Sequence, residues 1–186
     1  MGLDIFAANH LRYLQPVPKG KALDRIIEEL EEQNKSLYDV YFPLFPNHPS
    51  HRARLGGMKT GLYEYTSKSR KYSFRAGSYS GYNAWRNHLS LFTLNAEAEE
   101  VWNAPRSYRD QPFFELINFT DCDGRIGTSV AEKLAEDFTS HATRAKRFAS
   151  TLTDPEDWSP DNWLEVYRDF TRGLRLAAKN GALTFC

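Results

Sequence analysis

Side chains that could hold an anion are concentrated between Phe74 and Arg86. The pattern there predicts the end of a strand, a Gly/Ser turn, and a helix that begins near Gly81 or Tyr82. Backbone N–H groups at the start of such a helix attract phosphate, and arginine can bind phosphate through two parallel hydrogen bonds. We therefore predict a site for an anionic ligand that uses these residues: Arg75, Ser78, Tyr79, Ser80, Tyr82, Asn83 and Arg86.

The same turn also has a purely structural interpretation. Its serines can cap the following helix, and its arginines can pair with nearby acids. The segment is not a P-loop, because no Gly-Lys-Ser/Thr follows at the required spacing, and it does not match the dinucleotide-binding fingerprint. Both interpretations, an anion site and a structural turn, remain open on the sequence alone.

A second polar turn follows a compact apolar run, residues 113–118, which predicts a buried strand. Asn118 and Asp121 could read the edges of a ligand ring or ribose. If the protein is an enzyme, Glu115, Asp121 and Asp123 are the candidate general bases or metal ligands. The alternative is an Asx-turn, in which the carboxylates accept hydrogen bonds from backbone N–H groups ahead of the next helix.

Calcium-loop and cysteine chemistry are not favoured at this second turn. Its acids resemble the middle of a calcium-binding loop, but Phe119 and Val130 then occupy ligand positions that they cannot serve. Cys122 lies between two carboxylates, whose negative field raises the pKa of a thiol and disfavours a nucleophilic thiolate. We predict neither a metal site nor a cofactor.

Both turns, together with the two ends of the chain, resemble a family of uncharacterised proteins of bacteria and their phages. The family motif Gly-Ser-Tyr-x-Gly-Tyr-Asn-x-Trp-Arg is matched by Gly77–Arg86. A second motif, Asn-Phe-Ser-Asp-Cys-Glu-Gly-x-Ile-Gly, is matched from Asn118 onward, with Thr120 for Ser and Asp123 for Glu, whereas Cys186 replaces a terminal His. The resemblance implies a microbial or phage setting and no particular activity.

The composition is that of a folded domain. The chain has 186 residues, of which 41% are hydrophobic and 26% charged, as expected for one globular domain over residues 1–186. Interspersed strands and helices predict an α+β fold with a small, mostly antiparallel sheet packed with about four helices. No apolar run approaches the ~20 residues that span a bilayer, and Met1 begins no recognisable signal peptide. We therefore expect a soluble protein in the cytoplasm of a bacterial host, without membrane partners.

Hydrophobic periodicity assigns the expected elements. Helices are predicted over 23–30, 82–92 and 128–145. A last helix is predicted from an N-cap at Ser159, with Pro160 at its first position, to a C-cap at Asn180-Gly181. Strands are predicted at residues 3–6, at 62–66 and 72–76 as a hairpin, and at 183–185 as an edge strand. Residues 42–57 contain three prolines and end in two glycines, so they are expected to be irregular.

Charge is unevenly distributed along the chain although the net charge is zero. Residues 51–86 contain eight Lys/Arg and one acid, a local excess of +7, and residues 97–137 contain ten acids and four bases, an excess of −6. Zero net charge argues against bulk binding to nucleic acid or anionic membrane. A cationic stretch interleaved with aromatic residues suits an anionic ligand that also has a flat ring.

Three functions are compatible with these patterns. The first is binding of a small nucleotide-like ligand, which in a phage could sequester a nucleotide immune signal as a counter-defence sponge. The second is hydrolysis of a phosphodiester or glycosidic bond in such a nucleotide. The third is inhibition of a host protein through the polarised charge. A homo-oligomer is possible in each case.

Overall fold

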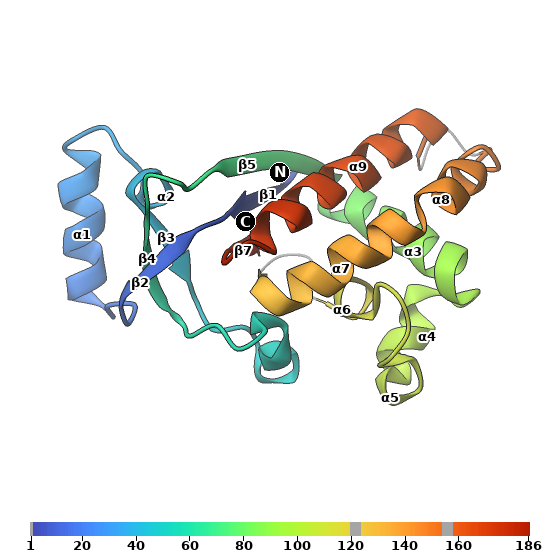
Figure 1. Ribbon diagram of the computed structural model, residues 1–186, viewed down its shortest axis with the longest axis horizontal. Coiled ribbons are helices and arrows are strands. Elements are labelled where there is room, and N and C mark those ends of the chain that lie inside the picture. Colours follow the sequence, from blue (N-terminus) through green and yellow to red (C-terminus); the bar gives the residue numbers. More distant parts are fainter. Residues whose placement is uncertain (1, 120–123, 154–157) are drawn as a thin grey trace.

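The computed structural model describes residues 2–119, 124–153 and 158–186 of the chain. It confirms the expected α+β fold, with antiparallel sheets packed against helices (Figure 1). The larger sheet has four strands in the order β5-β1-β7-β6, and the smaller has three in the order β2-β4-β3. The strands are β1 Gly2–Ala8, β2 Leu11–Gln15, β3 Tyr41–Leu44, β4 Gly61–Tyr65, β5 Lys71–Ser78, β6 Gly124–Gly127 and β7 Ala182–Phe185.

The larger sheet and the helices of the second half share one core. The longer helices there are α3 Tyr79–Leu94, α7 Thr128–Ser140, α8 Ala142–Ala149 and α9 Pro160–Ala177. Trp85, Trp163 and Phe170 are completely buried between them, and the rings of Trp85 and Phe170 are stacked at 5.0 Å between centroids. Aromatic burial on this scale is the main source of stability for such a domain.

Helix α9 begins as its sequence predicts. The hydroxyl of Ser159 accepts a hydrogen bond from the backbone N–H of Asn162 at 3.2 Å, and Pro160 occupies the first helical turn, where its missing N–H costs nothing. The remaining helices are α1 Lys21–Glu31, α2 Leu37–Val40, α4 Ala98–Asn103, α5 Pro105–Tyr108 and α6 Phe114–Ile117. No helix in the described ranges has both the length and the apolar character needed to cross a bilayer.

The predicted hairpin of residues 62–66 and 72–76 is wrong, because β4 and β5 belong to different sheets. β5 pairs with β1, and β4 pairs with β2 and β3. Asn9 and His10 separate β1 from β2, and His10 adopts a positive φ of 48° that turns the chain. The side chain of Asn9 accepts a hydrogen bond from the backbone N–H of Arg70 at 2.7 Å. This contact anchors the connection from β4 to β5 at the same corner, so each strand finds a different partner.

Three further local predictions also need correction. The apolar run at 113–118 forms the helical turn α6, which follows Phe113 at a φ of 60°. The proline-rich segment at 42–57 contains β3 and a 3-10 helix, η1, over Pro49–Leu55. Strand β7 is central, because it pairs with both β1 and β6. Short apolar runs do not distinguish a buried strand from a buried helical turn, and a pattern of alternation does not reveal whether a strand lies at an edge.

Candidate functional site

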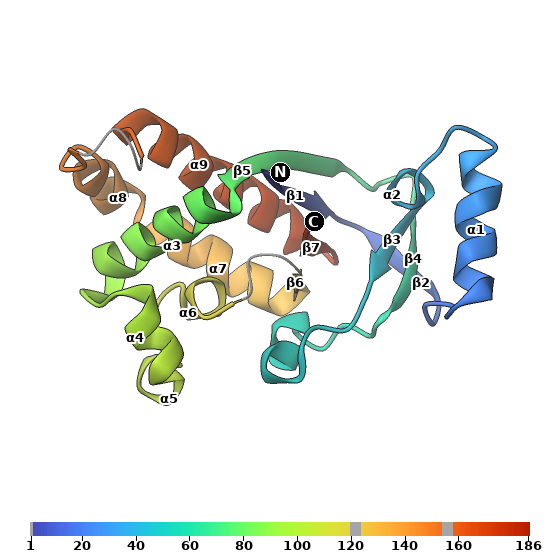
Figure 2. The ribbon, with the colours of Figure 1, turned by 180° about the vertical axis from the view of Figure 1, so that it is seen from behind.

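A pocket of about 730 Å³ lies between η1, α4, α5 and α6. We call it the arginine pocket. Figure 2 shows α4, α5 and α6 together on one flank of the molecule. The lining residues are Ser50, His51, Ala53, Arg54, Trp102, Pro105, Arg106, Arg109, Phe114, Glu115, Asn118 and Val130.

Arg54 is the buried cation of the arginine pocket, with 5% of its surface exposed. Its guanidinium donates to the carbonyl oxygens of Glu115, at 3.1 Å, and of Asn118. Its charge also lies 5.4 Å from the centroid of the Phe114 ring. Burial lowers the pKa of Arg54 to about 10, so the group remains charged near neutral pH. Among the described residues Arg54 has no carboxylate within ion-pair distance, although the charge of Glu115 acts on it from farther away and partly opposes the lowering of its pKa. An anion in the pocket could therefore approach Arg54 more closely than Glu115 does.

The other charges of the arginine pocket favour an anion as well. Arg106 and Arg109 line it and are exposed. The carboxylate of Glu115 is paired with Lys133 at 2.6 Å, and Lys133 also lies 3.2 Å from Asp137. Lys133 is shared by these two carboxylates, but the three arginines of the lining outnumber its single carboxylate, Glu115, so positive charge dominates the field in the pocket.

His51 lines the arginine pocket with an imidazole ring that is uncharged near neutral pH. Burial and then the charge of Arg54 lower the pKa of His51 to about 4, so its imidazole is uncharged near neutral pH. Within the described part of the chain, its Nδ1 atom is buried without a hydrogen-bond partner.

Trp102 supplies an aromatic surface beside these charges. Its indole N–H donates to the carbonyl of Ile117 at 2.9 Å, which fixes the ring, and 42% of the residue is exposed. The guanidinium of Arg86 lies 4.8 Å from the centroid of the ring. A fixed, partly exposed indole at the edge of a cationic pocket suits a flat ligand ring.

The two turns singled out in the sequence meet behind the arginine pocket. Arg86, with 3% of its surface exposed, donates to the carbonyl of Phe119 and to the side chain of Asn83. Arg86 therefore ties the first motif to the second and positions Trp102 without lining the pocket itself. From the predicted site, Asn118 and Glu115 do line it.

The remaining predicted residues of the first turn lie outside the lining of the arginine pocket. Arg75 is exposed on the edge strand β5, opposite Asp4. Tyr79 packs partly against the main core. Tyr82 is fully buried and stacks on Trp85 at 6.0 Å, so it presents no face to a nucleobase in this structure.

The serines of this turn make the contacts expected of a cap. Ser78 accepts a hydrogen bond from the backbone N–H of Gly81 at 3.0 Å and so caps helix α3. The hydroxyl of Ser80 lies 3.1 Å from that of Ser78. These contacts favour the structural interpretation of the turn around Ser78.

This cap can be tested separately from ligand binding. We expect Ser78→Ala to lower the free energy of unfolding by about 1 kcal/mol, because an N-cap hydrogen bond is lost. Urea denaturation would measure this change. Ligand retention by the folded variant should be unchanged, and a selective loss of retention would instead return Ser78 to the binding site.

Asp121 and Asp123, and Cys122 between them, lie outside the described residues. Their predicted roles as ligand-reading or catalytic groups stay predictions. Within residues 2–119, 124–153 and 158–186, no group of three His, Cys, Asp or Glu side chains could hold a metal ion.

The sequence interpretation missed most of the arginine pocket, namely His51, Arg54, Trp102, Arg106 and Arg109. Arg54 fell inside a segment expected to be irregular, and the two exposed arginines fell inside a stretch with an acidic excess. The positive excess over residues 51–86 was the available signal for Arg54, but it did not single out that residue.

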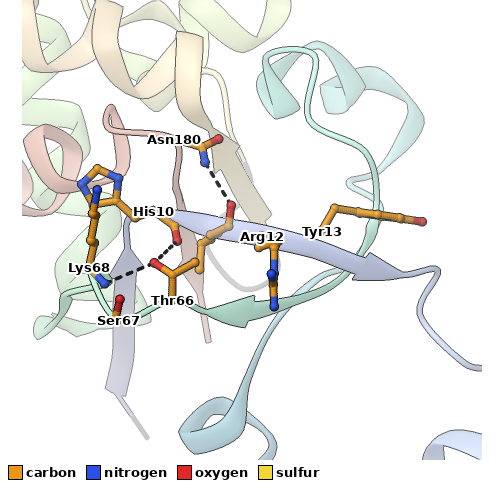
Figure 3. Close-up of a pocket in the computed structure, with 8 residues that line it drawn as sticks. His10, Arg12, Tyr13, Thr66, Ser67, Lys68 and Asn180 are labelled. Atoms are coloured by element: carbon orange, nitrogen blue, oxygen red, sulfur yellow. Dashed lines mark hydrogen bonds between the residues drawn. The ribbon is translucent and has the colours of Figure 1, made fainter.

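A second hollow, of about 510 Å³, lies where β2 passes the connection between β4 and β5 (Figure 3). Several of its polar groups already have partners within the chain. Arg12 pairs with Glu64, the Thr66 hydroxyl donates to the carbonyl of His10 at 3.0 Å, and the amide of Asn180 donates to the carbonyl of Leu11 at 3.0 Å. The arginine pocket, with its buried cation, is therefore the stronger candidate site.

No protein-family model, curated protein or solved structure matches this chain. The family resemblance of its two motifs stays a prediction, and the candidate site rests on its own geometry.

Proposed function

We propose that the arginine pocket binds a small nucleotide-like anion and holds it without turnover. In the bacterial or phage setting that the motifs imply, such a protein could act as a counter-defence sponge that sequesters a nucleotide signal. The observation that carries the proposal is Arg54, a buried cation that lines the pocket and has two carbonyl partners but no described carboxylate partner. A bound phosphate would place a negative charge within hydrogen-bonding distance of Arg54, whereas Glu115 acts on it only from farther away.

The arrangement of the lining suggests how such a ligand binds. Phosphate groups would lie between the buried Arg54 and the exposed Arg106 and Arg109. The flat ring would stack on Trp102, and the uncharged ring of His51 would lie beside the ligand. A pocket of about 730 Å³ falls within the usual range for small-molecule sites, which is about 300–1,000 Å³.

Heat release from the loaded protein tests this proposal. Purified protein is incubated with cyclic nucleotides and ADP-ribose-type nucleotides, desalted and then denatured by heat. Mass spectrometry of the released material should show one nucleotide class returned intact at near-equal molar ratio. Failure to retain any nucleotide would contradict the proposal and favour a protein-binding function.

A hydrolase is the second candidate, because the carboxylate of Glu115 belongs to the lining of the arginine pocket. In that case Glu115 would act as a general base, with the arginines stabilising the charge of the leaving group. Altered nucleotide in the heat-release experiment would indicate turnover. Glu115→Gln should abolish such turnover and preserve binding, whereas intact ligand from the wild-type protein supports the sponge.

The lowered pKa of His51 predicts that the free energy of unfolding depends measurably on pH. Above its ordinary pKa of 6.5 the side chain is neutral in both the folded and unfolded states. Between pH 6.5 and about 4 the unfolded state takes up a proton that folded His51 does not, so His51 lowers the stability of the fold as the pH falls. We expect His51→Gln to remove this contribution.

Urea denaturation of both proteins at pH 7.5 and pH 5 measures the effect. The stability advantage of wild type over the variant should be smaller at pH 5 than at pH 7.5. Equal differences at the two pH values would show that the imidazole is not held neutral. A bound anion beside His51 should raise its pKa and reduce the difference.

A further inference from the structure

A groove of about 370 Å³ lies between helices α7, α8 and α9, away from the arginine pocket. We call it the basic groove. Among the described residues four cationic side chains line it, and no carboxylate does: Lys146, Arg168, Arg172 and Arg175. Three of these cations follow one another along α9 at spacings of four and three residues, so they lie on one face of the helix.

Only two of these four cations have an ion pair or hydrogen bond with another described residue. Arg172 lies 3.9 Å from Asp169, and Arg175 donates to the hydroxyl of Thr139 at 3.0 Å. Lys146 and Arg168 are exposed and form no ion pair with any described residue. The basic groove therefore offers positive charge to a partner.

The basic groove also has an apolar floor. Leu164 is half-buried there, and Phe138 and Tyr167 lie beneath it with almost no exposed surface. Because both rings are buried, the floor offers no aromatic face for stacking a nucleobase. An apolar floor flanked by cations suits a helix that carries apolar side chains on one face and carboxylates on both sides of that face.

Helix α1 of this protein is such a segment. Its apolar residues fall at i, i+3, i+4 and i+7 on one face: Leu23, Ile26, Ile27 and Leu30. The first three are only half-buried, although Leu30 is buried. The helix also carries five acids and two bases: Asp24, Glu28, Glu29, Glu31, Lys21, Arg25 and the C-cap Glu32.

Helix α1 is attached to the fold by few contacts. It makes more contacts with the short helix α2 than with any other element. Figures 1 and 2 place α1 at one end of the long axis, beyond the smaller sheet, and α8 at the other end. The two complementary surfaces therefore cannot meet within one molecule.

We propose that α1 of one molecule docks into the basic groove of a second copy, so that the protein associates head to tail. The apolar face of α1 would lie on the floor formed by Leu164, and its flanking acids, Glu29 and Glu31, would face Arg168 and Arg172. Such a contact joins two different surfaces, so each molecule keeps one of them available for a further copy. Opposite charge on the two surfaces sets the orientation of the contact.

Sedimentation equilibrium from about 10 μM to 1 mM protein tests the association, which should have an affinity in the micromolar range typical of a small interface. At low salt the average mass should rise above the 21.4 kDa of one chain as concentration increases. Raising the salt to 1 M should reduce it, because ions screen the charges. A mass that stays at one chain throughout this range at low salt overturns the proposal.

Matched charge reversals identify the two surfaces. Arg168→Glu with Arg172→Glu should weaken self-association at least tenfold, and so should Glu29→Lys with Glu31→Lys on the flanks of the apolar face. The control, Glu28→Lys with Glu32→Lys, makes the same change in charge on the opposite face of α1 and should weaken it less than threefold. Circular dichroism checks that each variant remains folded.

Mixing the variants tests the direction of the contact. The groove variant keeps an intact α1, and the α1 variant keeps an intact groove, so an equimolar mixture should form a dimer containing one molecule of each. Each variant alone should self-associate at least tenfold more weakly than this mixture. Failure of the mixture to associate, or undiminished self-association of either variant alone, would overturn the head-to-tail contact.

Discussion

Replacing Arg54 by leucine is expected to weaken nucleotide binding by about a hundredfold, since a charge-assisted hydrogen bond is worth about 1.5–3 kcal/mol and each 1.4 kcal/mol is tenfold in affinity. Arg54 is the buried cation of the arginine pocket and keeps its charge near neutral pH. Leucine has a similar apolar body and cannot balance a phosphate. Isothermal titration with the nucleotide retained most strongly by the wild-type protein measures the loss.

Two further variants separate the charge of Arg54 from its structural role. Its hydrogen bonds to the carbonyls of Glu115 and Asn118 also hold η1 against α6, so Arg54→Leu will lose some stability. Arg106→Ala with Arg109→Ala leaves those bonds in place and should weaken binding at least tenfold. Arg75→Ala removes an exposed arginine that does not line the pocket and should leave affinity unchanged.

The second large effect is expected from replacing Arg86, which should lower the free energy of unfolding more than it weakens ligand binding. Arg86→Leu removes the donor to the carbonyl of Phe119 and the cation that lies over Trp102. We expect the free energy of unfolding to fall by about 3 kcal/mol, because a buried carbonyl loses a charged partner. Guanidinium denaturation with tryptophan fluorescence provides the measurement.

The outcome at Arg86 also tests whether the two motifs form one unit. If Arg86 joins them, Arg86→Leu should loosen Trp102 and raise the quenching of its fluorescence by iodide. Unchanged stability together with a large loss of ligand affinity would reassign Arg86 as a direct ligand contact. Arg75→Ala again serves as the control, since the exposed guanidinium of Arg75 has little to stabilise.

The sequence predicted α3 and α9 well because their signals are local, whereas the single helix expected over 128–145 is divided at His141 into α7 and α8. Helix α9 has its cap at Ser159, proline at its first position and an apolar stripe that includes Trp163 and Phe170. Strand pairing was not predictable in the same way. Whether β4 pairs with β5 or with β2 depends on the turn at Asn9 and His10, far away in the sequence, and no periodic pattern carries that information.

The candidate site was only partly predictable for a related reason. Asn118 begins the second motif and Glu115 precedes it by three residues. Both line the arginine pocket, and Arg86 supports it from behind. Arg54 and Trp102 lie in different segments with no shared motif, and tertiary folding alone brings them together. The interpretation of Ser78 as a helix cap could have been preferred from the sequence, because Ser followed by a helical pattern is the ordinary signature of an N-cap.

A crystal structure of the protein with its retained nucleotide tests the central claim most directly. We predict phosphate density within hydrogen-bonding distance of the Arg54 guanidinium and a ligand ring stacked on Trp102. Density for the nucleotide at the turn around Ser78, or in the hollow beside His10 and Lys68, with the arginine pocket empty would contradict it.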